Sequence, residues 1–273
     1  MPFVAQEVSG KGVFQQAETD RERITVKFGS DLVVGDEDVN TTLLQQIALQ
    51  ALVLHQEEKD LVVVTSGAVK YGRIIGRKEG RELTKVEAAF VGFDALMLEW
   101  QRAFESVGLL AMTLAVTGQS LNKKYSKQLQ QQVVTSGKIA VVNTHDGLNL
   151  SRYKYHQEAA NNDVVGERLA QLFSSLYIVC TNTDGVQDKN GESIRQFQSL
   201  EQLNDITFYQ NGTGNGTGGM ETKLHAAIRY SQSVVGRSTY IVNGQEENVL
   251  LKAVRGQEVG TKVQILAGDS YVK

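Results

Sequence analysis

The chain has 273 residues, 41% of them hydrophobic, with 28 basic and 31 acidic residues for a net charge of −3. A chain of this size and composition can bury a large core, so we expect a single large α/β unit. The near-balanced charge and the lack of a Lys/Arg-rich run argue against a nucleic-acid or anionic-membrane partner.

Short runs of β-branched residues alternate along the chain with segments of helical period. This alternation is typical of a mainly parallel sheet that helices cover on both faces. Residues 1–21 are polar and aperiodic, so we interpret them as a flexible extension without a chemical role. The predicted strands are 24–28, 61–65, 109–116, 139–143, 176–181 and 239–242, with 263–266 closing an edge, and the predicted helices are 39–57, 84–106, 123–136, 162–174, 221–232 and 248–255.

The only cysteine, Cys180, cannot form an internal disulfide and lies in an apolar run, where a small buried hydrophobe is expected. The N-terminus has no apolar segment of the length that a signal peptide needs, and no stretch approaches a membrane-spanning length. We therefore expect a cytoplasmic protein with a buried thiol.

A glycine-rich loop at residues 211–219, with five glycines in nine residues, leads directly into a predicted helix. Unpaired backbone N–H groups and the helix dipole would make an anion site of phosphate size there, to which Lys223 could add a positive charge. The spacing of Gly214, Gly216 and Gly219 fits a dinucleotide fingerprint but comes far too late in the chain, and no P-loop motif is present. A flexible surface linker is the alternative.

Polar turns follow four of the predicted strands. Taken singly, each turn is explained by the usual capping and turn residues. Because ligands collect at the carboxyl ends of strands in open α/β sheets, their shared placement points to one ligand site. The four turns are residues 27–30, 65–69, 143–147 and 181–186.

These segments carry a resemblance to the amino acid kinase family, and within it to the glutamate 5-kinases, over nearly the whole chain after the extension. The most specific segment is GTGGMETKL at residues 216–224, which is similar to a run characteristic of glutamate 5-kinases. The other similar segments are VKFGS at 26–30, TSGAV at 65–69, VNTHD at 142–146, NND at 161–163 and TDGV at 183–186.

The resemblance implies a three-layer α/β/α sandwich with a mainly parallel central sheet. Within a kinase domain at residues 22–273, about 22–175 would hold the acid substrate and about 176–273 would hold ATP. The implied reaction is ATP-dependent phosphorylation of the γ-carboxylate of L-glutamate, the first step of proline biosynthesis, by a homo-oligomer, either a dimer or a tetramer. Mg²⁺ would bridge phosphate oxygens and take few protein ligands. The four histidines show no metal-binding spacing, so we expect no metal site built by the protein.

The resemblance also implies roles for single residues. Lys27 and Lys223 would neutralise the transferring phosphoryl group from opposite sides, and Asp163 would orient both lysines by ion pairing. Asp163 is not expected to act as a base, because an ionised carboxylate nucleophile has no proton to lose. The substrate contacts would be Ser66, Asp146 and Asn162, and the ATP contacts, besides Lys27 and Lys223, would be Thr183, Asp184, Thr217, Gly218, Gly219, Met220, Glu221 and Thr222.

Two segments depart from the pattern of glutamate 5-kinases. Where those proteins usually read asparagine-glutamate-asparagine-aspartate, residues 143–146 lack the glutamate and include His145. Where they usually read glycine-aspartate-asparagine-aspartate, residues 160–163 have lost one carboxylate and keep the last two residues. At this length we also expect no room for the RNA-binding-like PUA domain that many bacterial members append.

Two alternatives to a glutamate kinase stay open. One is a relative that acts on another small acid or a phosphorylated compound, such as acetylglutamate, aspartate or a nucleoside monophosphate. The other is a non-catalytic small-molecule sensor on the same fold. A sensor would be expected to lose Lys27, Lys223 or Asp163, and all three are present.

Overall fold

The computed structural model describes residues 21–117, 139–145, 147, 161–206, 219–234 and 236–266. Within these residues the strands are β1 (Glu22–Phe28), β2 (Lys59–Thr65), β3 (Ala111–Val116), β4 (Ile139–Thr144), β5 (Leu176–Thr181), β6 (Gln196–Phe197), β7 (Thr239–Asn243) and β8 (Thr261–Val263). They form one sheet with the order β3-β4-β2-β1-β5-β7-β8-β6. Every neighbouring pair is parallel except β7 with β8.

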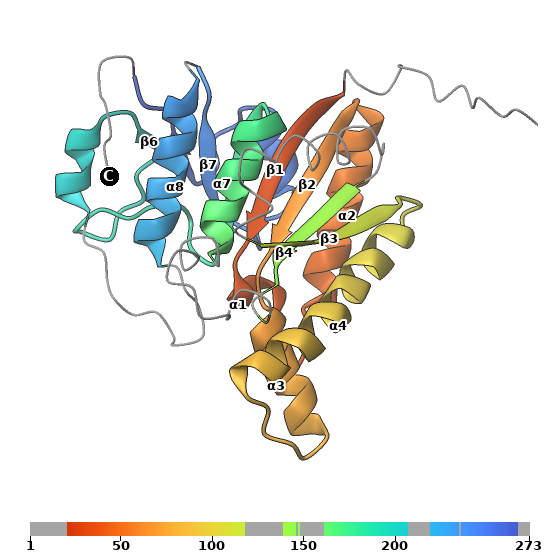
Figure 1. Cartoon of the computed structure of the whole chain (residues 1–273). Helices are drawn as coiled ribbons and strands as arrows, with labels where there is room; N and C mark the ends of the chain where they lie inside the picture. The colour runs from red at the N-terminus through yellow and green to blue at the C-terminus, as the bar shows by residue number, and fades with distance from the viewer. Residues whose placement is uncertain are drawn as a thin grey trace, which may run out of the picture.

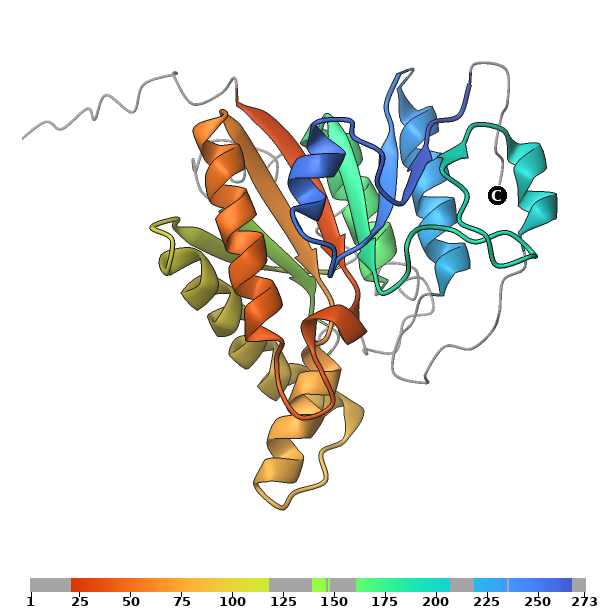
Figure 2. The ribbon, with the colours of Figure 1, turned by 180° about the vertical axis from the view of Figure 1, so that it is seen from behind.

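Helices cover both faces of this sheet. The helices α2 (Thr41–Gln56), α4 (Lys85–Glu105) and α9 (Val249–Val254) share one hydrophobic core with the strands, and α2 lies in front of the sheet in Figure 2. The helices α7 (Asn162–Phe173) and α8 (Met220–Ser233) pack on the opposite face and lie in front of the sheet in Figure 1. The expected three-layer α/β/α sandwich with a mainly parallel sheet is therefore confirmed.

Side-chain alternation along β1 divides the core between the two faces. Ile24, Val26 and Phe28 belong to the core on the α2 face. Thr25 and Lys27 point to the α7 face, where the Thr25 hydroxyl lies 2.7 Å from that of Ser174. A lysine is thus placed in the middle of the sheet, on the face that α7 and α8 cover.

The structure confirms the prediction that four polar turns share one edge of the sheet. The strands β4, β2, β1 and β5 are consecutive neighbours and all run parallel, so their carboxyl ends lie side by side. Cys180 in β5 is fully buried, as predicted, and burial raises the pKa of its thiol. None of the helices described has the length and apolar content needed to cross a membrane.

Two predicted details differ from the structure, and a third cannot be compared with it. The last strand is Thr261–Val263, and it does not close the sheet, because the two-residue strand β6 pairs on its outer side. The strand predicted at 109–116 begins only at Ala111. The helix predicted at 123–136 lies outside the described residues. Helical elements without a predicted range are α1 (Ser30–Val33), α3 (Ala68–Lys78) and the 3-10 helix η4 (Leu200–Asp205).

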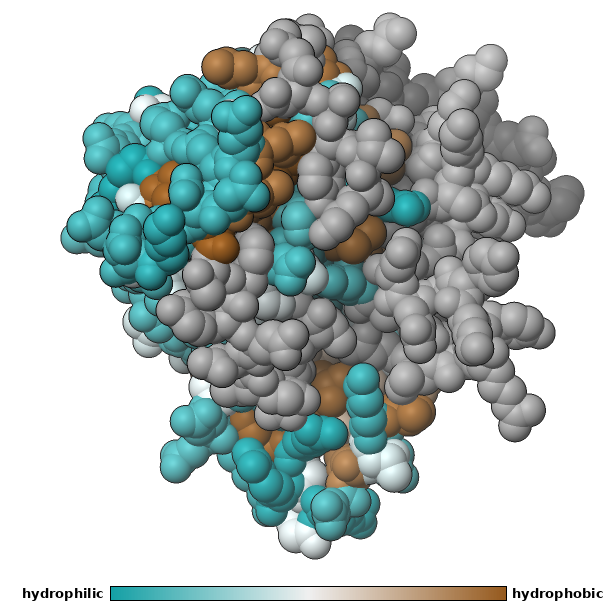
Figure 3. Space-filling view, turned by 90° about the vertical axis from the view of Figure 1, so that its left-hand side faces the viewer, coloured by the Kyte–Doolittle hydropathy of each residue, from teal (hydrophilic) through white to brown (hydrophobic). Residues whose placement is uncertain are grey.

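On the side of the molecule that faces left in Figure 1, the surface of the described residues is mainly hydrophilic. The hydrophobic residues on that side form small separate groups (Figure 3). Single exposed apolar side chains are usual on water-exposed surfaces. We therefore look for function at the sheet edge where the polar turns meet.

The helices α3 and α4 form a hairpin that projects beyond the sheet (Figure 1). Their backbones touch at two glycines. A Cβ on Gly72 would lie 1.9 Å from the carbonyl oxygen of Ala88, and a Cβ on Gly92 would lie 1.8 Å from that of Ala68. Because α3 begins directly after the turn at Ser66, this contact also fixes the turn.

We expect Gly72→Ala to reduce the free energy of unfolding by an amount near the top of the usual range for overpacking, about 1–3 kcal/mol, because the methyl group meets a backbone oxygen. Gly80→Ala is the control. Gly80 has φ +70°, and no atom lies within 4 Å of the new Cβ. Gly80→Ala should therefore reduce the free energy of unfolding by about 1 kcal/mol through backbone strain alone. Denaturant unfolding measures the loss of stability in each variant. A loss for Gly72→Ala that is no larger than the loss for Gly80→Ala would contradict the close packing.

Candidate active site

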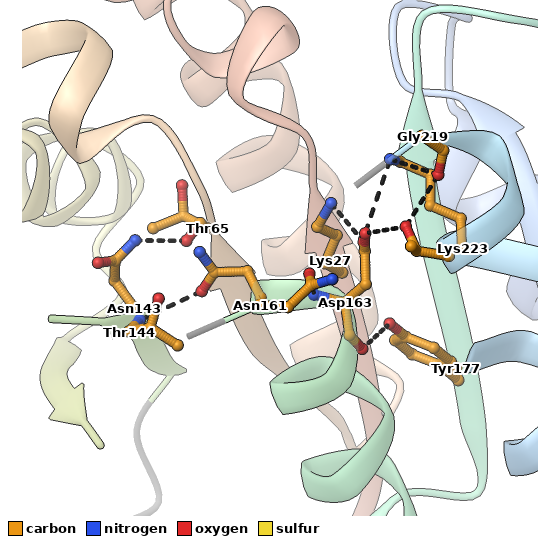
Figure 4. Close-up of polar contacts among 11 residues, drawn as sticks. Lys27, Thr65, Asn143, Thr144, Asn161, Asp163, Tyr177, Gly219 and Lys223 are labelled. Atoms are coloured by element: carbon orange, nitrogen blue, oxygen red, sulfur yellow. Dashed lines mark hydrogen bonds and ion pairs between the residues drawn. The ribbon is translucent and has the colours of Figure 1, made fainter. Parts of the chain in front are cut away.

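A buried ion pair joins the central strand to the first turn of α7. The ammonium of Lys27 in β1 lies 2.5 Å from Oδ1 of Asp163, and both side chains are buried (Figure 4). Asn161 caps α7 by accepting a hydrogen bond of 2.9 Å from the backbone N–H of Asp163. An aspartate, usual at that place in glutamate 5-kinases, would cap equally well, so this departure from the pattern leaves the helix start intact. The helix dipole adds to the stabilisation of the carboxylate, which sits in the first turn.

A second lysine reaches the same carboxylate from α8. The ammonium of Lys223 lies 3.7 Å from Oδ2 of Asp163 and 3.4 Å from the carbonyl oxygen of Gly219 (Figure 4). The hydroxyl of Thr222 lies 3.1 Å from the same Oδ2 and 2.9 Å from the same carbonyl oxygen. The carboxylate thus meets Lys27 with one oxygen, and Thr222 and Lys223 with the other.

Burial and charge act against each other in this cluster. Burial by itself would raise the pKa of Asp163, but the two ammonium groups and the hydrogen bonds outweigh it and hold the pKa below its usual value. Burial, with the nearby charge of Lys27, lowers the pKa of Lys223 to about 8, although Asp163 opposes that shift. Two cations therefore share one carboxylate, and the cluster carries a net positive charge when all three groups are ionised.

Two of the three predicted acid-binding residues, Ser66 and Asn162, lie beside this cluster. The backbone N–H of Ser66 donates to the carbonyl oxygen of Phe28, the residue after Lys27, over 3.2 Å. Asn162 precedes Asp163, and its Oδ1 accepts a hydrogen bond of 3.2 Å from the backbone N–H of Thr144 at the end of β4. Asp146 lies outside the described residues.

A buried polar chain that the sequence did not reveal supports this side of the site. The Asn143 amide donates to the carbonyl of Thr65 over 2.6 Å, and the Trp100 indole donates to the Thr65 hydroxyl over 3.0 Å. The Thr65 hydroxyl in turn donates to the carbonyl of Ser66 over 3.1 Å. These contacts tie the ends of β2 and β4 to α4. Asn143, Thr65 and Ser66 belonged to motifs, but nothing in the spacing of Trp100 indicated its partner.

His145, the other departure from the pattern, is buried at the end of β4. Its ring lies between Phe90 and Phe93 of α4, with centroid separations of 4.6 and 4.7 Å. In the part of the chain that the structure describes, its Nδ1 and the Oδ1 of Asn143 are buried without a hydrogen-bond partner. The substituted residue His145 is therefore packed against α4.

The predicted nucleotide residues fall into two groups. Gly219, Met220, Glu221 and Thr222 form the start of α8, next to Lys223. Thr183 and Asp184 follow β5, and no contact joins them to the carboxylate cluster among the described residues. The Thr183 hydroxyl donates to the carbonyl of Gly185 over 3.1 Å, and Asp184 pairs with Arg195 at 3.0 Å. Thr217 and Gly218 lie outside the described residues.

Across the described ranges there is no group of three or more His, Cys, Asp or Glu side chains that could hold a metal ion. Both oxygens of Asp163 already meet cations or a hydroxyl. A magnesium ion would fit this site as a companion of phosphate oxygens, with water as its remaining ligand.

Comparison with known proteins identifies the family of the chain. The model of the amino acid kinase family matches residues 22–243. The chain belongs to the amino acid kinase family. A matched glutamate 5-kinase of Thermus thermophilus is 28% identical over 251 residues, and one of Geobacter sulfurreducens is 30% identical over 257 residues. Each match covers 88% of this chain, but the chain spans only 66% of the length of each relative.

The fold of the amino acid kinase family also appears in the matched solved structures. A carbamate kinase from Giardia superposes with a TM-score of 0.65 at 11% identity, covering 90% of this chain and all of that one. At such low identity the likeness concerns the fold alone. The roles of the individual site residues therefore stay predictions that rest on motif and geometry.

The low pKa of Lys223 predicts a pH-dependent stability. The ordinary lysine value is 10.5, so between pH 8 and 10.5 the unfolded chain binds more protons than the folded chain. The contribution of Lys223 to the free energy of unfolding therefore rises with pH across this window, and below pH 8 the buried charge has its full cost. The stability of Lys223→Met relative to the wild type should accordingly fall as the pH rises through the window. Urea unfolding at several pH values measures this difference in stability. Lys252→Met is the control, because it removes a lysine outside the cluster. A difference for Lys223→Met that stays constant would contradict the low pKa.

Proposed function

We propose that the protein is an ATP-dependent kinase that phosphorylates the γ-carboxylate of L-glutamate, giving glutamyl 5-phosphate for proline biosynthesis. The observation that carries this proposal is the convergence of Lys27 and Lys223 on Asp163. The glutamate 5-kinases among the relatives support glutamate as the acceptor. As the resemblance implies, we assign residues 22–175 to the acid substrate and 176–273 to ATP.

The chemistry needed is mainly the neutralisation of charge. A carboxylate that attacks a phosphoryl group is an anion approaching an anion, and it has no proton that a base must remove. Fixed ammonium groups beside the transferring phosphoryl group lower the barrier to reaction. They stabilise the negative charge that is spread over its oxygens in the transition state. Lys27 would act from the acceptor side and Lys223 from the nucleotide side. Asp163 holds both ammonium groups near one point before the substrates arrive.

We infer that the two substrates bind at separate places along the sheet edge. The turn at Ser66 opens α3, whose N-terminus favours an anionic group such as the acceptor's carboxylate. The start of α8 at Gly219 offers a second helix N-terminus for the phosphates. In the strand order, β1 with Lys27 lies between β2, which leads to Ser66 and α3, and β7, which follows α8. This arrangement supports an in-line transfer from one side to the other.

A non-catalytic sensor is less well supported, because Lys27, Asp163 and Lys223 are all present and the carboxylate pairs with both lysines. The choice of glutamate over another small acid rests on the relatives. Mg²⁺ as companion of ATP, a homo-oligomer and a cytoplasmic location are further parts of the proposal that rest on the resemblance.

A panel of small acids incubated with ATP, Mg²⁺ and hydroxylamine tests the acceptor, because hydroxylamine traps acyl phosphates as hydroxamates. We expect a product from glutamate and little from acetylglutamate or aspartate. Product from another acid alone would move the activity to that acceptor. No product from any acid, together with normal nucleotide binding, would favour the sensor.

Lys223→Ala should lower the turnover of the same assay at least about a hundredfold, as expected when one electrostatic donor to the transition state is removed. Lys252→Ala in α9, which removes a lysine paired with Glu246 far from the carboxylate cluster, is the control and should keep near-normal turnover. Near-normal turnover in Lys223→Ala would contradict the role given to this lysine.

A further inference from the structure

The hydroxyl of Thr222 lies within hydrogen-bond reach of two acceptors but can donate to only one at a time. Its distances are 3.1 Å to Oδ2 of Asp163 and 2.9 Å to the carbonyl oxygen of Gly219. The carbonyl has other donors nearby, the backbone N–H of Lys223 at 3.5 Å and its ammonium at 3.4 Å. An ionised carboxylate is also the stronger acceptor. The hydroxyl proton therefore belongs to Asp163.

The two oxygens of Asp163 have different partners. Oδ1 meets Lys27 from the central strand at 2.5 Å. Among the described residues, Oδ2 meets groups of α8, the Thr222 hydroxyl at 3.1 Å and the more distant Lys223 ammonium at 3.7 Å. The hydroxyl is thus the closer of the two links between the carboxylate and α8.

Binding of a nucleotide would change this balance. In the proposed reaction Lys223 must direct its ammonium at phosphate oxygens, which weakens its contact with Oδ2. A buried carboxylate oxygen that loses a partner is costly, because water cannot replace the lost contact. A hydroxyl that stays in place would remove that cost and keep the carboxylate aligned with Lys27.

We propose that Thr222 is a positioning residue that holds Oδ2 of Asp163 so that Lys223 can leave it for the phosphates of the nucleotide. This inference rests on the proposed function for the identity of the ligand. It differs from the expectation that Thr222 is itself a nucleotide contact, because the hydroxyl acts here through Asp163.

A double-mutant cycle between Thr222 and Asp163 separates the two roles. The probe is the non-hydrolysable ATP analogue AMP-PNP with Mg²⁺, measured by calorimetry on the full chain. Thr222→Val, which keeps the shape and removes the hydroxyl, should weaken binding about tenfold in the wild type, the scale of one hydrogen bond to a charged group. In the Asp163→Asn background the same change should weaken binding less than about twofold.

Thr222→Ser keeps the hydroxyl and should bind AMP-PNP within about threefold of the wild type. Thr239→Val is the matched control, because its buried hydroxyl donates to the carbonyl of Ala227, outside the carboxylate cluster. It should weaken binding equally, and only slightly, in both backgrounds. An equal tenfold loss for Thr222→Val in both backgrounds would mean that the hydroxyl contacts the nucleotide itself. No loss in either background would show that it plays no part, and both results overturn the proposal.

The cycle does not depend on turnover. If the wild type binds AMP-PNP but phosphorylates none of the acids, the proposed function fails while the coupling is still measured. If AMP-PNP does not bind, the same four proteins are compared by urea unfolding without ligand. The bond in the ligand-free structure then predicts that Thr222→Val destabilises the wild type more than the Asp163→Asn background, and equal losses would overturn the inference.

Discussion

The site depends on one buried carboxylate. Asp163 is almost fully buried and ionised only because cations and hydrogen-bond donors surround it. Two separate elements bring those partners: β1 supplies Lys27, and α8 supplies Lys223 and Thr222. The helix α7, which carries Asp163, and the helix α8 must therefore each sit where the first turn faces the middle strand of the sheet. The packing of α7 and α8 on one face serves this requirement as well as the core.

The net positive charge of this cluster suits an anionic substrate such as a phosphate group. Two lysines share one carboxylate, and burial, together with the charge of Lys27, lowers the pKa of Lys223 to about 8. A phosphate group entering between the lysines would relieve their mutual repulsion and favour the charged form of both. The electrostatic groups are thus in place before the substrate arrives, which is the condition under which fixed charges act most strongly on a reaction.

Much of the fold could be predicted from the sequence, because buried parallel strands and amphipathic helices have strong local patterns. The shared edge of the polar turns followed from parallel order alone. The strand β6, with two residues, is too short for any periodic signal, and the contact between Gly72 and Ala88 depends on how two helices cross. Within the site, Lys27, Asp163 and Lys223 could be named only through motifs, because no spacing rule links positions so far apart. The bond from Trp100 to Thr65 gave no signal, since it arises from tertiary packing of unrelated segments.

The position of Lys27 shows why the cluster is better explained by function than by stability. Its neighbours along the strand, Val26 and Phe28, are apolar and buried, and β1 has neighbouring strands on both sides. Burying an ion pair there costs desolvation that the attraction between the charges only partly offsets, and apolar side chains of similar volume often do as well or better. Folding alone therefore gives no reason to keep a lysine in the centre of this sheet. A reaction between two anions does give one, because a charge held in a rigid strand cannot move away from the phosphoryl group as it is transferred.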